Sequence, residues 1–165
     1  MPHLLDKKNV EKLTAHGVFT EVELKSRYEI MLENYCKTII IEAGTMIDMA
    51  KKQILPAVST YATDLAESVG KKLSLGTDIA CKYEKEAVKK LSVLCDKIAE
   101  ATDSLEDALF KIKSAESIGE ESKMIRDTVL AAMSELRVVC DEAETMTAEK
   151  YWPFPTYGDL LFGVR

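Results

Sequence analysis

The chain has 165 residues, a length that suits one domain, and a net charge of -6, with 47% hydrophobic and 30% charged residues. This balance excludes a disordered chain, and the lack of a long uncharged apolar run excludes a membrane-spanning helix. Lys and Arg are scattered among the acidic residues, so the basic face that nucleic acid requires is absent and we expect no nucleic-acid partner.

A connector with one short helix is predicted at residues 1–19. Asp6 suits the N-cap of a helix that runs to His16, and Gly17 is expected to end it. The chain start has no signal-peptide pattern, so we expect a cytoplasmic protein. Isolated cysteines favour the same compartment, because their spacing is typical of reduced, buried thiols; they are Cys36, Cys81, Cys95 and Cys140.

One very long amphipathic helix is predicted from about residue 20 to about residue 69. Thr20 and Glu23 form a capping-box pattern at its start. At about 1.5 Å per residue it would be roughly 75 Å long, more than one small core needs, so we interpret it as a strut. Apolar columns that repeat every eleven residues return to nearly one azimuth and define its inner face: Leu24, Tyr35, Met46, Ala57; Tyr28, Ile39, Ala50, Tyr61; Leu32, Ala43, Ile54, Leu65.

Two residues weaken this helix. Pro56 removes a backbone hydrogen bond and crowds the preceding turn, so we predict a kink there within a helix that continues. Gly44 is a second soft point. Around it the helix is apolar on most of its circumference, which indicates cover from more than one side. We therefore predict an interface in this belt, with Ile40, Ile41 and Met49 as its candidate residues.

A second long helix is predicted over residues 77–118, after Gly70 and Gly76 end the first. Its strict heptad alternates small and large residues, which permits close antiparallel packing. A break near Thr102 stays open, because Asp103 with Glu106 could cap a new helix there.

A third long helix is predicted over residues 120–146. Ser117 and Glu120 form another capping-box pattern around the hinge Gly119. Short connections make the three long helices antiparallel neighbours. The predicted fold is therefore all-α, with an elongated antiparallel bundle of three long helices over residues 20–147, the first kinked near Pro56.

Residues 148–165 predict an extended C-terminal tail rich in aromatic residues and proline, because proline disfavours helix. Exposed aromatic rings are costly, so we expect these rings to dock. Packing back on the bundle and docking on another domain or subunit both stay open. The candidate interface residues of the tail are Trp152, Phe154, Tyr157 and Phe162.

No catalytic, cofactor or metal site is predicted in this chain. Metal and haem sites in bundles need inward carboxylates with Glu-x-x-His, or axial ligands, but the only histidines, His3 and His16, precede the bundle. Phosphate-binding loops, nucleophile elbows and zinc motifs are absent. Glu42 and Asp48 suit either a partner's cation or plain solvation. The mixed charges fit helix partners better than a membrane surface, so no membrane partner is expected.

A group of segments carries a family resemblance. They are Arg27-Tyr28-Glu29-Ile30, Glu33-Asn34-Tyr35-Cys36-Lys37-Thr38, Thr45-Met46-Ile47-Asp48-Met49-Ala50-Lys51-Lys52, Ile54-Leu55-Pro56-Ala57-Val58 and, most specifically, Trp152-Pro153-Phe154-Pro155-Thr156-Tyr157-Gly158-Asp159-Leu160-Leu161-Phe162. These resemble the C-terminal region of type III glutamine synthetase over essentially the whole chain. The sequence departs from the family pattern at Ile40, where a polar residue is usual, and at Gly44, where a larger residue is usual.

The resemblance implies a parent enzyme that joins ammonia to glutamate with ATP and a divalent metal (Mg or Mn), in a large ring-shaped homo-oligomer. That family's metal-, nucleotide- and glutamate-binding motifs lie upstream and match no position here. The leading hypothesis is therefore a non-catalytic C-terminal domain that packs against the upstream catalytic region of the same polypeptide and supports oligomer assembly. The alternative is a stand-alone helical interaction or scaffold protein, which rests on the heptads and the acidic surface alone.

Overall fold

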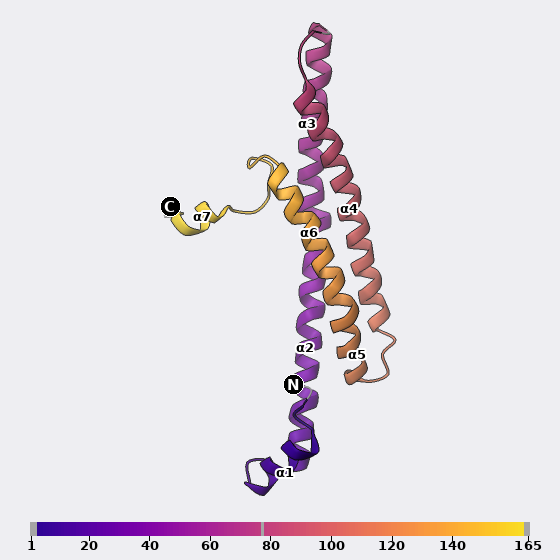
Figure 1. Cartoon of the computed structure of the whole chain (residues 1–165), viewed down its shortest axis with the longest axis vertical. Helices are drawn as coiled ribbons and strands as arrows, with labels where there is room; N and C mark the ends of the chain where they lie inside the picture. The colour runs from indigo at the N-terminus through magenta and orange to yellow at the C-terminus, as the bar shows by residue number, and fades with distance from the viewer. Residues whose placement is uncertain (1–2, 77, 164–165) are drawn as a thin grey trace.

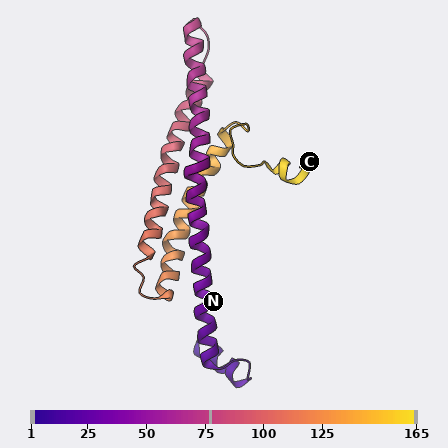
Figure 2. The same cartoon turned by 180° about the vertical axis from the view of Figure 1, so that it is seen from behind.

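A computed structural model describes residues 3–76 and 78–163, and all regular elements within these residues are helices. Figure 1 shows a long rod made of α2 and α3, beside which the chain returns as α4 and rises again as α5 and α6. Figure 2 shows the same antiparallel arrangement from behind. The predicted all-α elongated bundle is confirmed. In chain order the elements are α1 (Lys7–Ala15), α2 (Glu21–Met49), the π-helical turn η1 (Ala50–Ile54), α3 (Leu55–Leu75), α4 (Lys82–Ile112), α5 (Ile118–Met124), the π-helical turn η2 (Ile125–Val129), α6 (Leu130–Met146) and α7 (Tyr157–Phe162).

The short helix α1 begins and ends where the sequence predicts. Asp6 occupies the N-cap position, but its carboxylate makes no capping bond and lies instead 2.9 Å from Nδ1 of His3. At the other end Gly17 adopts a φ of 63°, a conformation that glycine adopts without a steric penalty. The backbone N–H of Val18 donates to the carbonyl of Leu13, which satisfies the helix end.

The long helix starts with the predicted capping box. Oγ1 of Thr20 accepts from the N–H of Glu23 at 3.2 Å, and the Glu23 carboxylate accepts from the N–H of Thr20 at 2.8 Å. The helix then continues past Gly70 to Leu75, so the earlier of the two expected ends is wrong. A reason is that Lys72 pairs with Glu84 of α4, which holds the last turns against the bundle.

A π-helical turn, η1, lies directly before Pro56, the residue near which the sequence predicts a kink. Across this turn the N–H of Leu55 donates to the carbonyl of Ala50, one residue further back than in an α-helix. Pro56 then occupies the first turn of α3, where its missing N–H costs least. The rod therefore continues through proline. The column residues that follow the turn stay buried or half-buried: Ile54, Ala57, Tyr61 and Leu65.

Helix α4 is continuous through Thr102, so the alternative of a break there is wrong. Thr102 is fully buried, and its hydroxyl donates to the carbonyl of Ile98 at 2.6 Å, which satisfies the polar group inside the helix. The helix begins at Lys82 and ends at Ile112, shorter at both ends than predicted. Position 77 lies outside the described residues. The heptad residues that the structure buries are Ala87, Leu91, Leu94, Ile98, Leu105, Ala108 and Ile112.

The third long helix begins at Ile118, and its cap is only half of the predicted box. Oγ of Ser117 accepts from the N–H of Glu120 at 3.2 Å, but the Glu120 carboxylate accepts from the N–H of Glu116. A second π-helical turn, η2, interrupts this helix. The turn buries both of its ends, Ile125 and Val129, in the core.

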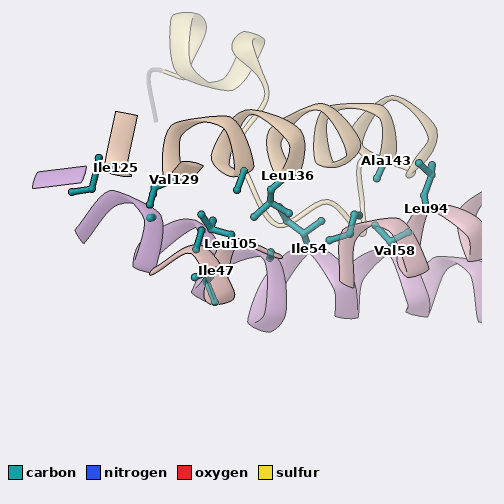
Figure 3. Packing of buried hydrophobic residues seen from close by; sticks show 14 of the residues in the cluster. Ile47, Ile54, Val58, Leu94, Leu105, Ile125, Val129, Leu136 and Ala143 are labelled. Carbon is teal, nitrogen blue, oxygen red and sulfur yellow. The ribbon is translucent and has the colours of Figure 1, made fainter. Parts of the chain in front are cut away.

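One hydrophobic core runs along the bundle and joins all three long segments. Burying a large aliphatic side chain fully contributes about 1.5–3 kcal/mol, so this core accounts for the stability of the bundle. Figure 3 shows how side chains of the long helix, of α4 and of the last helix meet: Ile47, Ile54 and Val58; Leu94 and Leu105; Ile125, Val129, Leu136 and Ala143.

The C-terminal tail is not extended throughout, which corrects the prediction. Residues 157–162 form α7, which Thr156 and Asp159 cap reciprocally: Oγ1 of Thr156 accepts from the N–H of Asp159 at 3.2 Å, and the Asp159 carboxylate accepts from the N–H of Thr156 at 2.9 Å. Both prolines of the tail precede this box, so they leave the helix undisturbed. Figures 1 and 2 show α7 standing away from the bundle on a narrow stem.

Candidate interaction surfaces

The chain itself covers only one side of the apolar belt of α2. Ile40 is half-buried and packs against the hydrophobic core, and Met49 is half-buried. Ile41, the next residue after Ile40, is 69% exposed and points away from that core. Of the three residues predicted as an interface, Ile41 therefore offers the most free surface, and the interface role itself stays a prediction.

The root of the tail folds back on the bundle. The ring of Tyr151 packs on that of Tyr61, with centroids 5.0 Å apart, and its hydroxyl donates to the carboxylate of Asp64. Trp152 and Phe154 meet edge to face at 6.0 Å and pack against the hydrophobic core. These contacts fix the start of the tail on the bundle. Two of the candidate interface residues, Trp152 and Phe154, therefore anchor the tail within its own chain.

The indole of Trp152 has a buried donor without an acceptor. Its Nε1–H is the buried side-chain polar atom that finds no hydrogen-bond partner among the described residues. Leaving a buried donor unpaired costs about 1–3 kcal/mol. The apolar contacts that the rest of the ring makes with Phe154 and the core therefore have to offset this cost.

Three neighbouring apolar residues at the end of the tail have largely exposed side chains. Leu160 is 68% exposed, Leu161 is 71% exposed and Phe162 is 81% exposed, and all three belong to α7. The predicted interface residue Phe162 is thus on the surface. The side chain of Tyr157, another predicted interface residue, lies outside the described residues. Sequence reasoning missed α7, although Thr156 and Asp159 carry a capping-box signal.

A second apolar feature lies where α1 packs on α2, and no sequence pattern indicated it. A surface hollow of about 520 Å³ is lined by apolar side chains of Leu4, Leu13 and Met31 and by the polar residues His3, Asn9 and Lys12. Met31 is 42% exposed here. Such a hollow appears only when two helices meet, so periodicity within one helix cannot locate it.

The ionisable groups of the bundle whose pKa values are shifted have structural roles, and the thiols among them are unreactive. Burial raises the pKa of the Cys140 thiol to about 11, and it also raises the pKa of the Cys36 and Cys95 thiols. A raised pKa keeps these thiols protonated and unreactive at neutral pH. The Lys72 ammonium hydrogen-bonds the carboxylate of Glu84 and lowers its pKa, because the bond stabilises the charged form.

The described ranges contain neither a cluster of potential metal ligands nor a helix that could span a membrane. Within residues 3–76 and 78–163, no three His, Cys, Asp or Glu side chains gather in a way that could hold a metal ion. Among the same residues, no helix combines the length and the apolar character that crossing a bilayer requires.

Comparison with known proteins shows which family this chain resembles. Residues 1–73 match the family model of the glutamine synthetase C-terminal domain. The chain is 37% identical to a glutamine synthetase of Butyrivibrio fibrisolvens over 165 residues, which is 100% of this chain and 24% of the relative. A type-3 glutamine synthetase of Dictyostelium discoideum is 26% identical, over 98% of this chain and 23% of its own length. A glutamine synthetase of Bacteroides fragilis (strain YCH46) is 25% identical, over 97% and 22%.

The chain therefore spans about a quarter of the length of the curated relatives that it matches, 24% in the first case. The similarity reaches across the helical bundle and the aromatic tail alike, because the aligned region covers 97% or more of this chain in each case. The resemblance to the C-terminal region of type III glutamine synthetase that the sequence motifs indicate is confirmed.

Proposed function

The chain corresponds to the C-terminal domain of glutamine synthetase, and on that premise we propose that it is a non-catalytic support for packing and oligomer assembly. The upstream catalytic region of the same polypeptide would perform the glutamate–ammonia ligase reaction with ATP and a divalent metal, Mg or Mn. The parent would be a cytoplasmic homo-oligomer. In this arrangement the bundle is a rigid support, and the tail and the belt around Ile41 contact other parts of the assembly.

The observation that carries this proposal is the C-terminal arm, which we define as residues 153–163. Its apolar end is 68–81% exposed at three successive residues, while its root is fastened to the bundle by Tyr151 and Trp152. Clustered exposed apolar side chains mark contact sites in soluble proteins. A fastened root with a free apolar end suits a segment that reaches another part of an assembly.

No three His, Cys, Asp or Glu side chains gather as metal ligands in residues 3–76 or 78–163. A divalent metal in an ATP site can be held by one or two carboxylates together with the phosphates, so this observation concerns metal sites made of protein ligands alone. In the proposed arrangement ATP and metal bind in the upstream region.

Assembly of the full-length enzyme tests the proposal directly. The double variant Trp152→Ala with Phe154→Ala removes the rings that fasten the arm, so the arm loses its fixed position and assembly should weaken. Light scattering should then give a smaller mean mass than the unmodified enzyme. Phe110→Ala is the matched control, because Phe110 is an aromatic residue of α4 that is 72% exposed. An unchanged mass for the double variant would contradict the proposal.

The catalytic part of the proposal has its own test. The purified 165-residue chain should bind no ATP and form no glutamine, and measurable ligase activity of this chain would contradict a non-catalytic role. The coding sequence upstream of Pro2 supplies a further check. A continuous reading frame for a catalytic region supports the proposal, whereas its absence favours the stand-alone scaffold.

A further inference from the structure

Two unpaired apolar surfaces lie on this chain and match each other in kind. One is the arm tip, which we define as Leu160, Leu161 and Phe162. The other is the α1–α2 hollow, lined by His3, Leu4, Asn9, Lys12, Leu13 and Met31, with a volume of about 520 Å³. The first is a projection and the second is a depression, and none of the three arm-tip residues belongs to the hydrophobic core of the described residues.

The arm tip is pre-formed for binding. The two reciprocal bonds between Thr156 and Asp159 fix the first turn of α7 without help from the bundle. The preceding stem contains Pro153 and Pro155, which restrict its backbone. A helix that is already ordered loses little conformational entropy when it binds, and apolar helix faces commonly bind in grooves.

The two surfaces cannot meet within one chain. In Figures 1 and 2 the arm leaves the bundle beside the C-terminal end of α6, whereas α1 lies at the far end of α2. Both views separate α7 from α1 by much of the length of the rod. A projection and a depression at different places on one molecule produce a head-to-tail contact when two copies meet, and repetition of that contact closes a ring or extends a filament.

The charges of the two surfaces are complementary. Asp159 is the charged residue of α7, and Lys12 is a cation of the hollow that has no salt-bridge partner among the described residues. Nearby acids are occupied, since Asp6 pairs with His3 and Glu11 pairs with Lys7 at 3.8 Å. The hollow therefore offers a free positive charge beside apolar surface to a helix of opposite charge.

We propose that the arm tip of one copy of this chain binds in the α1–α2 hollow of a second copy, with Lys12 of the hollow facing Asp159 of the arm. This inference rests on the proposed role in assembly and names the two surfaces that make the contact. Each copy gives one arm and receives one, so the contact is heterologous.

Complementation between two variants of the 165-residue chain is the sharpest test. Phe162→Asp places a charge on the arm tip, and Met31→Asp places one in the hollow; both residues are exposed, at 81% and 42%, so the bundle should fold in each variant, as circular dichroism verifies. The unmodified chain should form species larger than one chain in multi-angle light scattering. Each variant alone should be monomeric.

Mixing the two variants should restore one contact only. The Met31→Asp chain keeps a functional arm, and the Phe162→Asp chain keeps a functional hollow, so the mixture should give a one-to-one dimer and no larger species. Phe110→Asp is the control, because this phenylalanine is 72% exposed on α4 and should leave the self-association unchanged. If Met31→Asp lowers the helix content, Lys12→Glu replaces it, since a charge reversal at this solvated position should weaken the same contact.

The outcomes separate this inference from the proposed function. A monomeric unmodified chain, or variants whose mixture stays monomeric, overturns the contact between arm tip and hollow. If Phe162→Asp nevertheless reduces the mass of the full-length enzyme, the proposed role in assembly stands and the arm binds the upstream region instead. If the chain self-associates as expected but the full-length enzyme is insensitive to both variants, the contact stands and the role in assembly fails.

Discussion

The bundle core and the C-terminal arm are both helical, but different interactions order them. Core residues such as Leu105 and Leu136 are fully buried between long helices, and the N-cap residue of α4 makes no side-chain capping bond. In the arm a complete capping box orders α7, and the apolar residues that follow stay on the surface. The contrast indicates that tertiary burial stabilises the bundle, whereas the arm keeps its apolar surface for a contact.

Truncating one leucine in each region should change the free energy of unfolding by very different amounts. This is the largest difference that we expect between the two regions. Leu105→Ala leaves a cavity in the core, and such truncations of fully buried leucine destabilise a protein by about 2–5 kcal/mol. Leu161→Ala, at a residue that is 71% exposed, should change the free energy of unfolding by less than about 0.5 kcal/mol. Urea denaturation followed by circular dichroism measures both. Equal losses would mean that the arm packs on the bundle in solution.

Sequence reasoning succeeded for the bundle because one helix face was visible in the spacing of its residues. The heptads of α4 and the capping box at Thr20 predicted elements that the structure contains. It did not find the π-helical turns, because the buried residues around η1, Ile47, Ala50, Ile54 and Val58, keep spacings of three or four residues, as in an uninterrupted α-helix. In the tail Pro153 and Pro155 outweighed the signal of Thr156 and Asp159, so α7 was missed.

The candidate surfaces were only partly predictable for a physical reason. Which side of the belt is free depends on where α4 and α6 lie, and this separates Ile40 from Ile41, its neighbour in sequence. The α1–α2 hollow is formed jointly by two helices and the first described residues, so no single segment forms it alone. Patterns along one chain indicate an apolar face, but its exposure is a property of the assembled structure.

The hydrogen bond at the base of the arm locates the boundary between the two regions. Tyr151→Phe removes the bond from the Tyr151 hydroxyl to Asp64 and keeps the ring on Tyr61. We expect a loss of about 1 kcal/mol in the free energy of unfolding, because Asp64 stays solvated when its donor is gone. Thermal unfolding measures this change. No loss at all would show that this hydrogen bond does not help to hold the base of the arm, which then depends on the packing of the Tyr151, Trp152 and Phe154 rings.

The same glycine substitution made in each region should give different results. In Gly44→Ala the new Cβ meets nothing within 4 Å and the helix gains propensity, so unfolding should become about 0.5–1 kcal/mol less favourable. In Gly158→Ala the new Cβ lies 3.5 Å from Oγ1 of Thr156, an ordinary contact. Since Leu160, Leu161 and Phe162 of α7 do not belong to the hydrophobic core, we expect the midpoint of thermal unfolding to stay unchanged there. A shift for Gly158→Ala would show that the two regions are coupled.

Acid should act on the two regions through different carboxylates, and this is the smallest effect. The pKa of Glu84 lies below its ordinary value of 4.5 because of its hydrogen bond with Lys72, and the pKa of Asp159 lies below 3.8 because of its bonds with Thr156. For both groups the folded pKa is depressed, so the stabilisation is complete above the ordinary value and is lost as the pH falls through the folded one.

Glu84→Gln should therefore flatten the acid limb of bundle stability, measured as the denaturation midpoint between about pH 5 and pH 2. Asp159→Asn should leave that limb unchanged, because Asp159 stabilises α7 alone. The amide nitrogen signals of α7 in NMR should instead lose their dependence on acid. If Asp159→Asn flattened the bundle's own acid limb, α7 would have to unfold together with the bundle, and the arm could not be an independently ordered segment.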